Sequence, residues 1–283
     1  MNEIRTIGVV GAGQMGNGIA HVAAQSGYDV ICSDVFPAAL DKAAAVIQKN
    51  LGRQVKKERI TAADADAIFA RIRFESSTAP LEACQLVVEA ATERVDLKFQ
   101  IFESLSTIVP AGGILASNTS SISITAIAAH TDRPDKVIGM HFMNPVPIMK
   151  LVEIIRGMAT SQETYDATVA VSTAMGKTTV DGRDMPGFIV NRVLMPYINE
   201  AATALYESIG TVEDIDTAMK LGTNVPMGPL QLADFIGLDT CLAIMNVLHS
   251  GMGDSKYRPC PLLVKYVEAG WLGRKTGRGF YTY

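Results

Sequence analysis

The fold of this chain is decided by I-G-V-V-G-A-G-Q-M-G, residues 7–16, and by the segment that follows as far as Asp34. An apolar run leads into a glycine-rich turn, the turn opens a helical pattern, and a second apolar run ends at Asp34. A lone G-x-G-x-x-G spacing is a weak signal, but here it lies between a strand and a helix, with an acid after the next strand. This order is typical of a βαβ dinucleotide-binding unit; the alternative is a glycine turn without a ligand.

Each residue of the turn has a physical task in that interpretation. Gly11 allows the tight turn, Gly13 allows the backbone to approach a pyrophosphate, and Gly16 allows the helix to pack closely on the strand. Gln14 and Met15 begin a helix whose unpaired N–H groups and positive dipole end attract phosphate. We therefore predict that these five residues contact a dinucleotide cofactor.

Asp34 predicts which dinucleotide binds. A carboxylate at this position can accept hydrogen bonds from ribose hydroxyls, whereas a 2′-phosphate would meet its negative charge. The next residues are Val35 and Phe36, so no arginine follows directly. The sequence favours NAD over NADP as the cofactor.

The composition limits the classes of protein and partner. Of 283 residues, 48% are hydrophobic and 19% are charged, as in a globular protein with a large core. A net charge of −4 gives no reason to expect nucleic acid as a partner. We see neither a signal-peptide pattern nor an apolar run of membrane-spanning length, so we expect a cytoplasmic protein that binds no membrane. The four cysteines lack C-x-x-C spacing, so buried thiols are expected rather than disulfides or a metal site.

The chain divides into two predicted domains. Strand and helix patterns alternate over residues 1–185, which predicts a doubly wound Rossmann-type α/β domain with a mostly parallel sheet. Only helical patterns follow, so an all-α domain is expected over residues 186–283. Individual helices are expected over residues 37–50, before a basic stretch at 53–59, and over 188–209. We expect the helical domain to close over the substrate and to form a subunit interface; the alternative is that its helices only pad the sheet.

Among four histidines, His141 is placed best for catalysis. It lies at the end of a predicted strand, at the edge where open α/β sheets bind ligands, and histidine suits proton transfer to and from an alcohol. Glu153 lies in the next apolar strand, after the turn signal of residues 144–147. A turn there can place Glu153 beside His141, where it would orient the ring and stabilise an imidazolium. The residues alone leave two alternatives open: a structural His141, and a Glu153 that faces solvent.

Further polar residues lie where a substrate could bind. Residues 117–121, S-N-T-S-S, follow a predicted strand and can bond a reacting oxygen, or can simply form a solvated loop with a helix cap. Asn191 lies among apolar residues of the long helix and needs a partner, either substrate or backbone. Lys56 and Lys57 belong to a basic run whose plainest interpretation is a solvated helix surface.

Seven segments together resemble the L-3-hydroxyacyl-CoA dehydrogenase family over essentially the whole length. They are I-G-V-V-G-A-G-Q-M-G-N-G-I-A (7–20), E-A-A-T-E (89–93), A-S-N-T-S-S (116–121), G-M-H-F-M-N-P-V-P-I-M-K-L-V-E (139–153), P-G-F-I-V-N-R (186–192), G-P-L-Q-L-A-D-F-I-G-L-D (228–239) and G-R-K-T-G-R-G-F-Y (273–281). The family usually has two phenylalanines after its catalytic histidine, whereas Phe142 is followed here by Met143. Because methionine is flexible and fills a similar volume, this departure affects the shape of the pocket more than the chemistry.

The resemblance implies roles for individual residues. His141 would be the catalytic base and acid with Glu153 as its partner, and Ser120 and Asn191 would bind the substrate oxygen. Lys56, with Lys57 beside it, would meet the phosphates of coenzyme A, which raises the basic run above an ordinary surface. Further cofactor contacts implied by the family are Glu93, Lys98, Asn118, Asn144 and Lys275.

The resemblance also implies the reaction: reversible hydride transfer between NAD(H) and C3 of a short-chain (S)-3-hydroxyacyl-CoA thioester, by a homodimer that assembles through its helical domain. Two other classes remain open. One is a dehydrogenase of a non-thioester hydroxy acid, and the other is a non-catalytic, crystallin-like structural protein with the same fold.

Overall fold

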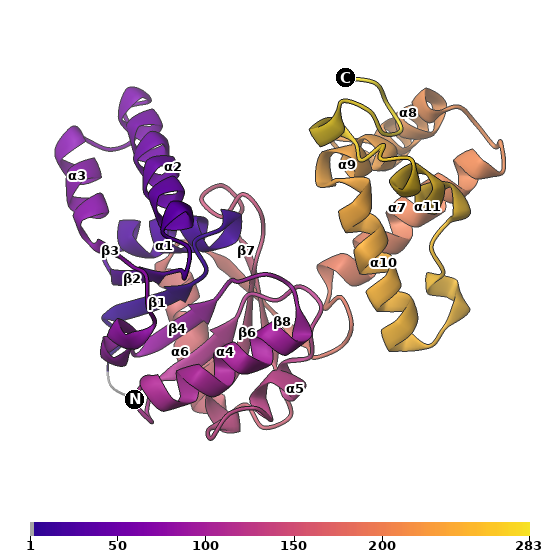
Figure 1. The fold of residues 1–283 in the computed structure, drawn as a ribbon. Helices are drawn as coiled ribbons and strands as arrows, with labels where there is room; N and C mark the ends of the chain where they lie inside the picture. Colours follow the sequence, from indigo (N-terminus) through magenta and orange to yellow (C-terminus); the bar gives the residue numbers. More distant parts are fainter. Residues whose placement is uncertain (1–2) are drawn as a thin grey trace. The chain divides into compact units, whose positions relative to one another are not determined.

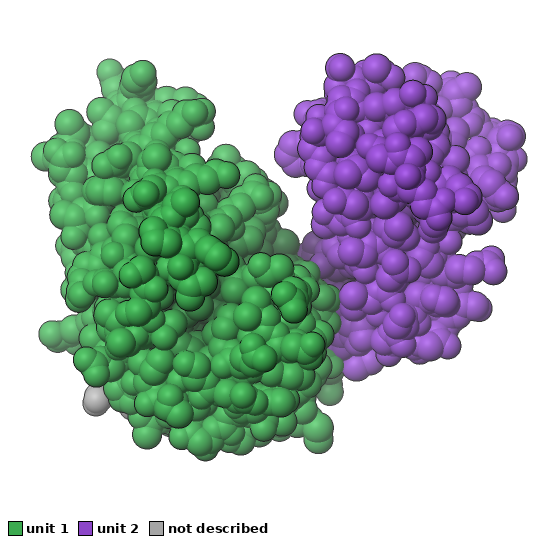
Figure 2. Space-filling view, viewed as in Figure 1, with its two compact units in different colours: residues 1–184 green, residues 185–283 purple. Residues whose placement is uncertain are grey.

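The computed structural model describes residues 3–283, and it divides the chain into two compact units (Figure 2). The first unit is Met1–Asp184 and the second is Met185–Tyr283. Each unit has its own hydrophobic core, so each is described by itself.

The first unit is built on a sheet of eight strands within residues 3–283, in the order β3-β2-β1-β4-β5-β6-β7-β8. The strands are β1 (Thr6–Val10), β2 (Asp29–Ser33), β3 (Ile72–Glu75), β4 (Leu86–Glu89), β5 (Ile114–Ser117), β6 (Val137–Phe142), β7 (Leu151–Arg156) and β8 (Thr178–Arg183). Strands β1 to β6 are parallel, β7 is antiparallel to β6, and β8 is parallel to β7. The mostly parallel sheet confirms the predicted fold class, and its order reverses between β1 and β4, where doubly wound sheets bind ligands.

The glycine turn between β1 and helix α1 (Gln14–Gln25) has the geometry that its sequence predicts. Gly11 has a φ of 96°, which L side chains rarely adopt. A Cβ on Gly16 would lie 1.7 Å from the carbonyl oxygen of Gly11, so only glycine lets α1 pack this closely on β1. No heavy atom would lie within 4 Å of a Cβ on Gly13, so the backbone at the start of α1 remains open to a ligand.

Helices cover both faces of the sheet (Figure 1). Residues of α1, α2 (Pro37–Lys56) and α6 (Gln162–Ala174) share one core with one face. On the other face, Ile124 of α5 (Ile124–Ala128) lies against Gly139 of β6. Helices α2 and α3 (Ala62–Ala70) lie side by side as an arm, and α4 (Val95–Ile108) connects β4 to β5.

The arm corrects one predicted boundary. Arg53 and Lys56, which were expected to follow the helix 37–50, instead lie within it, because α2 continues to Lys56. Buried Ile47 and Leu51 are four residues apart, so the apolar stripe continues through Asn50. Arg53 and Lys56 lie in the last turn, where the helix dipole favours positive charge.

Strands β6 and β7 pair so that His141 is directly opposite Glu153. Side chains alternate between the faces of a strand, and directly opposite residues lie on the same face. Met140 and Ile154, which are also paired, belong to the core shared with α1, so His141 and Glu153 lie on the face of α5. The sequence left open whether Glu153 faces solvent, but its exposed fraction is 0%.

The second unit is helical throughout the elements that the structure describes in it. Its α-helices are α7 (Val190–Tyr206), α8 (Val212–Thr223), α9 (Pro229–Ile236), α10 (Leu238–Met252) and α11 (Pro261–Glu268). Helix α7 is shorter than the predicted 188–209 because Phe188 and Ser208 have positive φ angles of 48° and 60°, which a right-handed helix excludes. Asp216 and Asp234 are buried acceptors that hold the start of α9 and the C-terminal tail.

Three further findings concern residues 3–283. No single helix there is both long and apolar enough to cross a membrane; α9 and α10 pass that test only as a pair, across a bend of 99°. Cys32, Cys84, Cys241 and Cys260 are free and buried, and burial raises the pKa of the first three to about 12. No group of three metal-ligating side chains is found among the described residues.

Candidate active site

The candidate site of the first unit lies at the carboxyl ends of neighbouring strands. The glycine turn follows β1, Glu89 ends β4, Ser117 ends β5, and His141 lies one residue before the end of β6. Because these strands are parallel, their carboxyl ends share one edge of the sheet. Segments far apart in the sequence therefore meet at this edge.

His141 and Glu153 form a buried hydrogen bond across β6 and β7. The Nδ1 atom of His141 lies 2.6 Å from Oε2 of Glu153, and the two residues are 7% and 0% exposed. An ionised carboxylate only accepts hydrogen bonds, so Nδ1 carries the proton. This bond orients the ring and places a negative charge where an imidazolium would need it.

Two asparagines connect the neighbouring loops. The carboxamide oxygen of Asn118 accepts a hydrogen bond of 2.9 Å from the backbone N–H of Phe142, which ties the end of β5 to the residue after His141. The carboxamide oxygen of Asn144 accepts one of 3.1 Å from the side chain of Gln14, at the start of α1. The peptide bond between Asn144 and Pro145 is cis. These bonds link the glycine turn, the loop after β5 and the loop after β6.

Glu93 organises the serine-rich loop after β5. One of its carboxylate oxygens accepts hydrogen bonds from the hydroxyl of Thr119 (2.6 Å), the backbone N–H of Ser120 (2.9 Å) and the hydroxyl of Ser121 (3.0 Å). Burial acts to raise the pKa of Glu93, but nearby Lys98 and these hydrogen bonds outweigh burial and lower it. The ionised carboxylate of Glu93 thus holds this loop in place. Immediately beyond the loop, the side chain of Ser123 caps α5.

Lys98 lies beneath the loop that Glu93 holds. It is 1% exposed, and its ammonium lies 2.7 Å from Glu89 and 3.3 Å from Glu93. The cofactor contact that the family resemblance implies for Lys98 stays a prediction.

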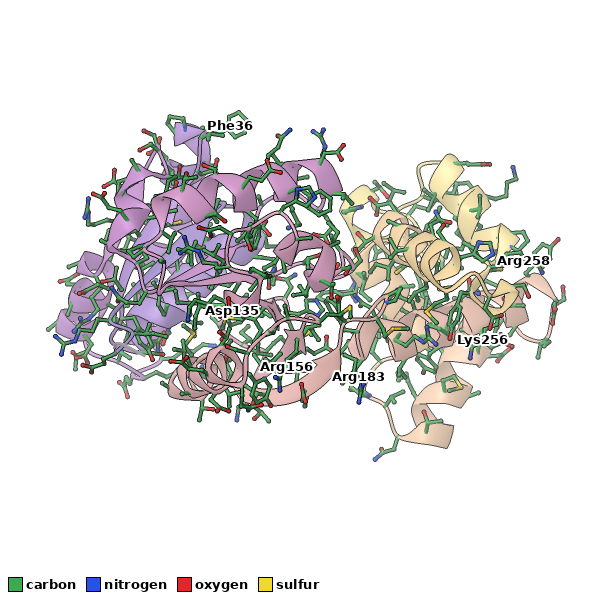
Figure 3. The ribbon with its side chains drawn as sticks, turned by 90° about the horizontal axis from the view of Figure 1, so that it is seen from below. Phe36, Asp135, Arg156, Arg183, Lys256 and Arg258 are labelled. Atoms are coloured by element: carbon green, nitrogen blue, oxygen red, sulfur yellow. The ribbon has the colours of Figure 1, made fainter. Side chains whose placement is uncertain are left out.

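Asp34 lies directly beside the glycine turn. One carboxylate oxygen accepts a hydrogen bond of 2.7 Å from the backbone N–H of Ala12, and the other accepts one of 3.0 Å from that of Phe36. The side chain of Phe36 is 69% exposed and projects outward from the ribbon (Figure 3). The residues thus fit a dinucleotide: an open backbone at Gly13, the N-terminus of α1 and an acid anchored beside the turn.

A cavity of about 510 Å³ adjoins this turn. It is lined by the first turns of α1, by α2 and by the loop after β6. Gly18 of α1 makes the close approach possible, because a Cβ there would lie 2.8 Å from Val146 of that loop.

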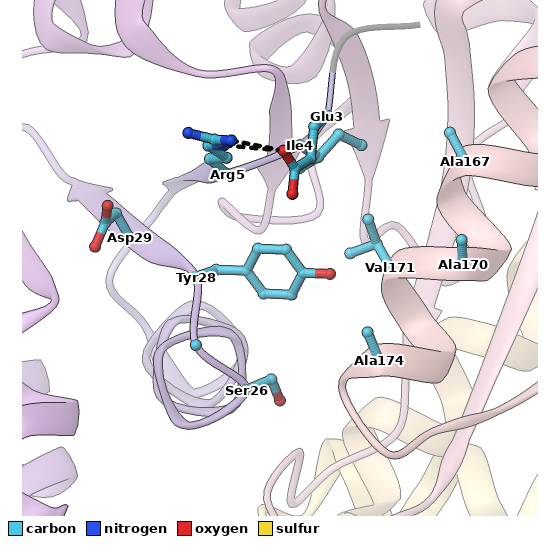
Figure 4. Close-up of a pocket in the computed structure, with 11 residues that line it drawn as sticks. Glu3, Ile4, Arg5, Ser26, Tyr28, Asp29, Ala167, Ala170, Val171 and Ala174 are labelled. Carbon is cyan, nitrogen blue, oxygen red and sulfur yellow. Dashed lines mark hydrogen bonds and ion pairs between the residues drawn. The ribbon is translucent and has the colours of Figure 1, made fainter.

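A second cavity, of about 640 Å³, lies at the opposite edge of the sheet (Figure 4). It is lined by residues that precede β1, by the turn from α1 to β2 and by α6, with Tyr28 facing the alanines of α6. Since it adjoins the amino ends of β1 and β2, it is not part of the candidate site.

The remaining predicted site residues have separate surroundings. Lys56 and Lys57 are exposed at the end of α2, in the arm. Asn191, in the first turn of α7, is 8% exposed, and Lys275 donates a hydrogen bond of 2.6 Å to Asp239; both belong to the second unit. Their approach to His141 and to a cofactor stays a prediction.

The structure also assigns supporting roles that the sequence analysis missed. The buried ammonium of Lys177 donates hydrogen bonds to the carbonyl oxygens of Val146 and Met149, which fixes the loop after β6. The carboxylate of Asp184 accepts hydrogen bonds from Ser123 and from the first backbone N–H groups of α5. Glu89 could have been found from the sequence by the signal that identified Glu153, an acid within an apolar strand.

The glycine turn at the switch point of a doubly wound sheet, with an acid after β2 and a carboxylate-held histidine at the same edge, defines a nicotinamide-dependent dehydrogenase. Comparison with known proteins gives the family. Residues 6–185 match the model of the 3-hydroxyacyl-CoA dehydrogenase NAD binding domain, and residues 187–283 match that of the 3-hydroxyacyl-CoA dehydrogenase C-terminal domain. The chain belongs to the 3-hydroxyacyl-CoA dehydrogenase family, as its sequence segments predicted.

Similar proteins match over nearly the full length. A 3-hydroxybutyryl-CoA dehydrogenase of Bradyrhizobium diazoefficiens is 57% identical over 99% of this chain and 96% of its own. A probable 3-hydroxybutyryl-CoA dehydrogenase of Bacillus subtilis is 56% identical over 99% of this chain and 98% of its own. The crystal structure of (S)-3-hydroxybutyryl-CoA dehydrogenase from Ralstonia eutropha superposes with a TM-score of 0.97 at 52% identity, over 99% of each chain.

Proposed function

We propose that this protein catalyses the reversible, NAD-dependent oxidation of short-chain (S)-3-hydroxyacyl-CoA thioesters, with 3-hydroxybutyryl-CoA and acetoacetyl-CoA as its substrate pair. The observation that carries the proposal is the buried bond of 2.6 Å between His141 and Glu153, at the sheet edge that also holds the glycine turn. The named activities of the full-length relatives support this choice of substrate.

In this mechanism His141 moves the proton. Because Glu153 holds Nδ1, the opposite ring nitrogen, Nε2, takes the proton of the 3-hydroxyl group during oxidation and returns it to the oxygen during reduction. Glu153 stabilises the imidazolium that His141 becomes when it takes this proton. NAD, when bound, supplies the hydride acceptor.

Other residues hold the reactants. Ser120 and Asn191 bind the substrate oxygen, and Lys56 and Lys57 meet the phosphates of coenzyme A. Contacts to the cofactor come from Gly11, Gly13, Gln14, Met15, Gly16, Asp34, Glu93, Lys98, Asn118, Asn144 and Lys275. Favourable features are the N-terminus of α1 for the pyrophosphate and the anchored loop that carries Ser120.

The two domains divide this work. We assign cofactor binding mainly to residues 1–185, with Lys275 as a contact from residues 186–283, and we assign both substrate closure and homodimer formation to residues 186–283. Exposed apolar side chains of the second unit, among them Val193 at 67% and Ile209 at 72%, suit a subunit interface. A cytoplasmic location agrees with the four buried thiols, which a reducing compartment preserves.

The test is oxidation of NADH, followed by its absorbance, with acetoacetyl-CoA, with free acetoacetate and with NADPH in place of NADH. We expect turnover of the thioester with NADH and little turnover of the free acid. Because of the carboxylate of Asp34, we also expect NADH to be preferred over NADPH. Turnover of the free acid alone would indicate the non-thioester class. A folded protein that binds NADH and turns over neither compound would contradict the proposal and favour a structural role.

A further inference from the structure

The carboxyl end of β4 holds a buried ion pair to which the proposed mechanism gives no task. Glu89 is 0% exposed and Lys98 is 1% exposed. The ammonium of Lys98 lies 2.7 and 2.9 Å from the two carboxylate oxygens of Glu89. Burying two charges is costly unless good geometry and further hydrogen bonds compensate, so the other bonds of the pair are informative.

Glu89 also bonds the segments on both sides of α4. Its Oε1 accepts a hydrogen bond of 2.7 Å from the backbone N–H of Ala91, and its Oε2 accepts one of 2.7 Å from the hydroxyl of Ser117. The oxygen of Ser117 in turn accepts a hydrogen bond of 3.2 Å from the backbone N–H of Thr119. One route of contacts therefore runs from Glu89 through Ser117 into the loop after β5.

A second route runs through Lys98. Its ammonium lies 3.3 Å from Oε2 of Glu93, whose Oε1 holds Thr119, Ser120 and Ser121. Both routes from Glu89 thus end on residues 119–121. The network comprises two carboxylates and one ammonium, so removing one charge alters the balance of the whole.

We propose that Glu89 is a positioning residue, which acts through Lys98 and Ser117 to fix residues 119–121 and hence Ser120. The inference rests on the proposed function, because it assumes that Ser120 binds the substrate oxygen. Without the charge of Glu89, the Lys98 ammonium is drawn to Glu93 and competes with the donors of the loop. The loop then shifts although no residue in contact with the substrate has been changed.

The decisive variant is Glu89→Gln, which keeps the shape of the side chain and removes its charge. We expect kcat with acetoacetyl-CoA to fall about 10–100-fold, because a displacement near 1 Å at a reacting centre has effects of that size. The Kd of NADH, measured by fluorescence titration, should change less than kcat. In the cofactor-free protein, hydrogen exchange of the peptide that covers residues 118–123 should become faster, a readout that needs no turnover.

Ser117→Ala is the milder variant and carries the test if Glu89→Gln does not fold. It removes the Ser117 route alone and should change kcat and loop exchange in the same direction, by about 2–10-fold. The matched control is Ser106→Ala, a serine 9% exposed on the same helix as Lys98, whose hydroxyl donates a hydrogen bond of 3.0 Å to the Phe102 carbonyl and belongs to neither route. It should resemble the wild type in both readouts.

Unchanged kcat and unchanged loop exchange in Glu89→Gln would overturn the inference. So would faster exchange throughout the first unit with unchanged kcat, because that outcome indicates a general stabilising role. If the wild type fails to turn over acetoacetyl-CoA, the proposed function fails, and the exchange of residues 118–123 still tests the positioning by Glu89.

Discussion

Two histidines of the first unit are buried, yet their surroundings differ. His141 is 7% exposed, and the carboxylate of Glu153 lies 2.6 Å from its Nδ1. His21, on α1, is 0% exposed; its Nδ1 has no hydrogen-bond partner within residues 3–283, and its Nε2 lies 3.3 Å from the amide of Gln54. Burial lowers the pKa of His21 to about 4, so it stays neutral at physiological pH. The difference teaches that burial alone produces an inert histidine, and that a paired carboxylate equips one to accept a proton.

The largest effect is expected when His141 itself is removed. His141→Gln keeps a polar side chain but cannot exchange protons, so kcat with acetoacetyl-CoA should fall by about 10²–10⁴-fold, the usual contribution of general acid–base catalysis. Steady-state kinetics with NADH titration measures this, and the Kd of NADH should stay close to that of the wild type. Retained turnover would mean that the proton carrier has been assigned to the wrong residue.

Glu153→Gln would make His141 resemble His21 in lacking a carboxylate partner. The ring loses its orientation and the imidazolium loses its opposing charge, so kcat should fall, by no more than the roughly 10²–10⁴-fold expected for His141→Gln. The pH dependence of kcat should change as well, whereas the control Glu103→Gln removes a carboxylate from half-buried His130, outside the candidate site, and should leave the profile unaltered. Identical profiles for Glu153→Gln and the wild type would show that Glu153 has only a structural role.

His21 predicts how stability depends on pH. Its pKa in the folded state, about 4, lies below its ordinary value of 6.5, so the unfolded chain binds the proton first as pH falls. Folding stability is therefore lost below pH 6.5, by about 2 kcal/mol at pH 5 relative to pH 7. Urea unfolding at both pH values should show that His21→Phe loses less stability on acidification than the wild type, and an equal loss in the two proteins would contradict this role for His21.

The smallest effect concerns Lys177, a buried cation that, among the described residues, hydrogen-bonds only carbonyl oxygens. Lys177→Met keeps its length and removes both bonds to the loop that carries Asn144. We expect KM for NADH to rise about 3–10-fold with kcat nearly unchanged, the size of one or two lost hydrogen bonds. Lys136→Met, at the opposite edge of the sheet, should leave KM as it is; equal KM values in the two variants would contradict this role for Lys177.

Much of the fold could be predicted because its signals are local. Most strands of the sheet are short apolar runs, and the spacing of Gly11, Gly13 and Gly16 indicates the geometry of the glycine turn. The predicted end of α2, at residue 50, was wrong because a run of basic residues at a helix terminus resembles a loop in composition. The limits of α7 depend on positive φ angles at Phe188 and Ser208, for which neither residue type is a signal.

The candidate site could be predicted only in part, because its geometry depends on strand register and on contacts between distant segments. A turn between β6 and β7 was visible in residues 144–147, but only the antiparallel register places Glu153 opposite His141 rather than one residue away. Lys98, Lys177 and Asp184 act through tertiary contacts to segments distant in sequence, so no local pattern reveals their partners. The register and these contacts are what the structure adds.

The two hydrogen bonds of Asp34 have a consequence for anyone who wishes to engineer the cofactor preference. A substitution that admits a 2′-phosphate also cuts the ties from the carboxylate to Ala12 and Phe36, and with them the coupling between the glycine turn and the segment after β2. A variant at Asp34 that prefers NADP should therefore also bind the pyrophosphate of the cofactor more weakly. A useful redesign would pair the change at Asp34 with a second one that restores an acceptor for the Ala12 N–H.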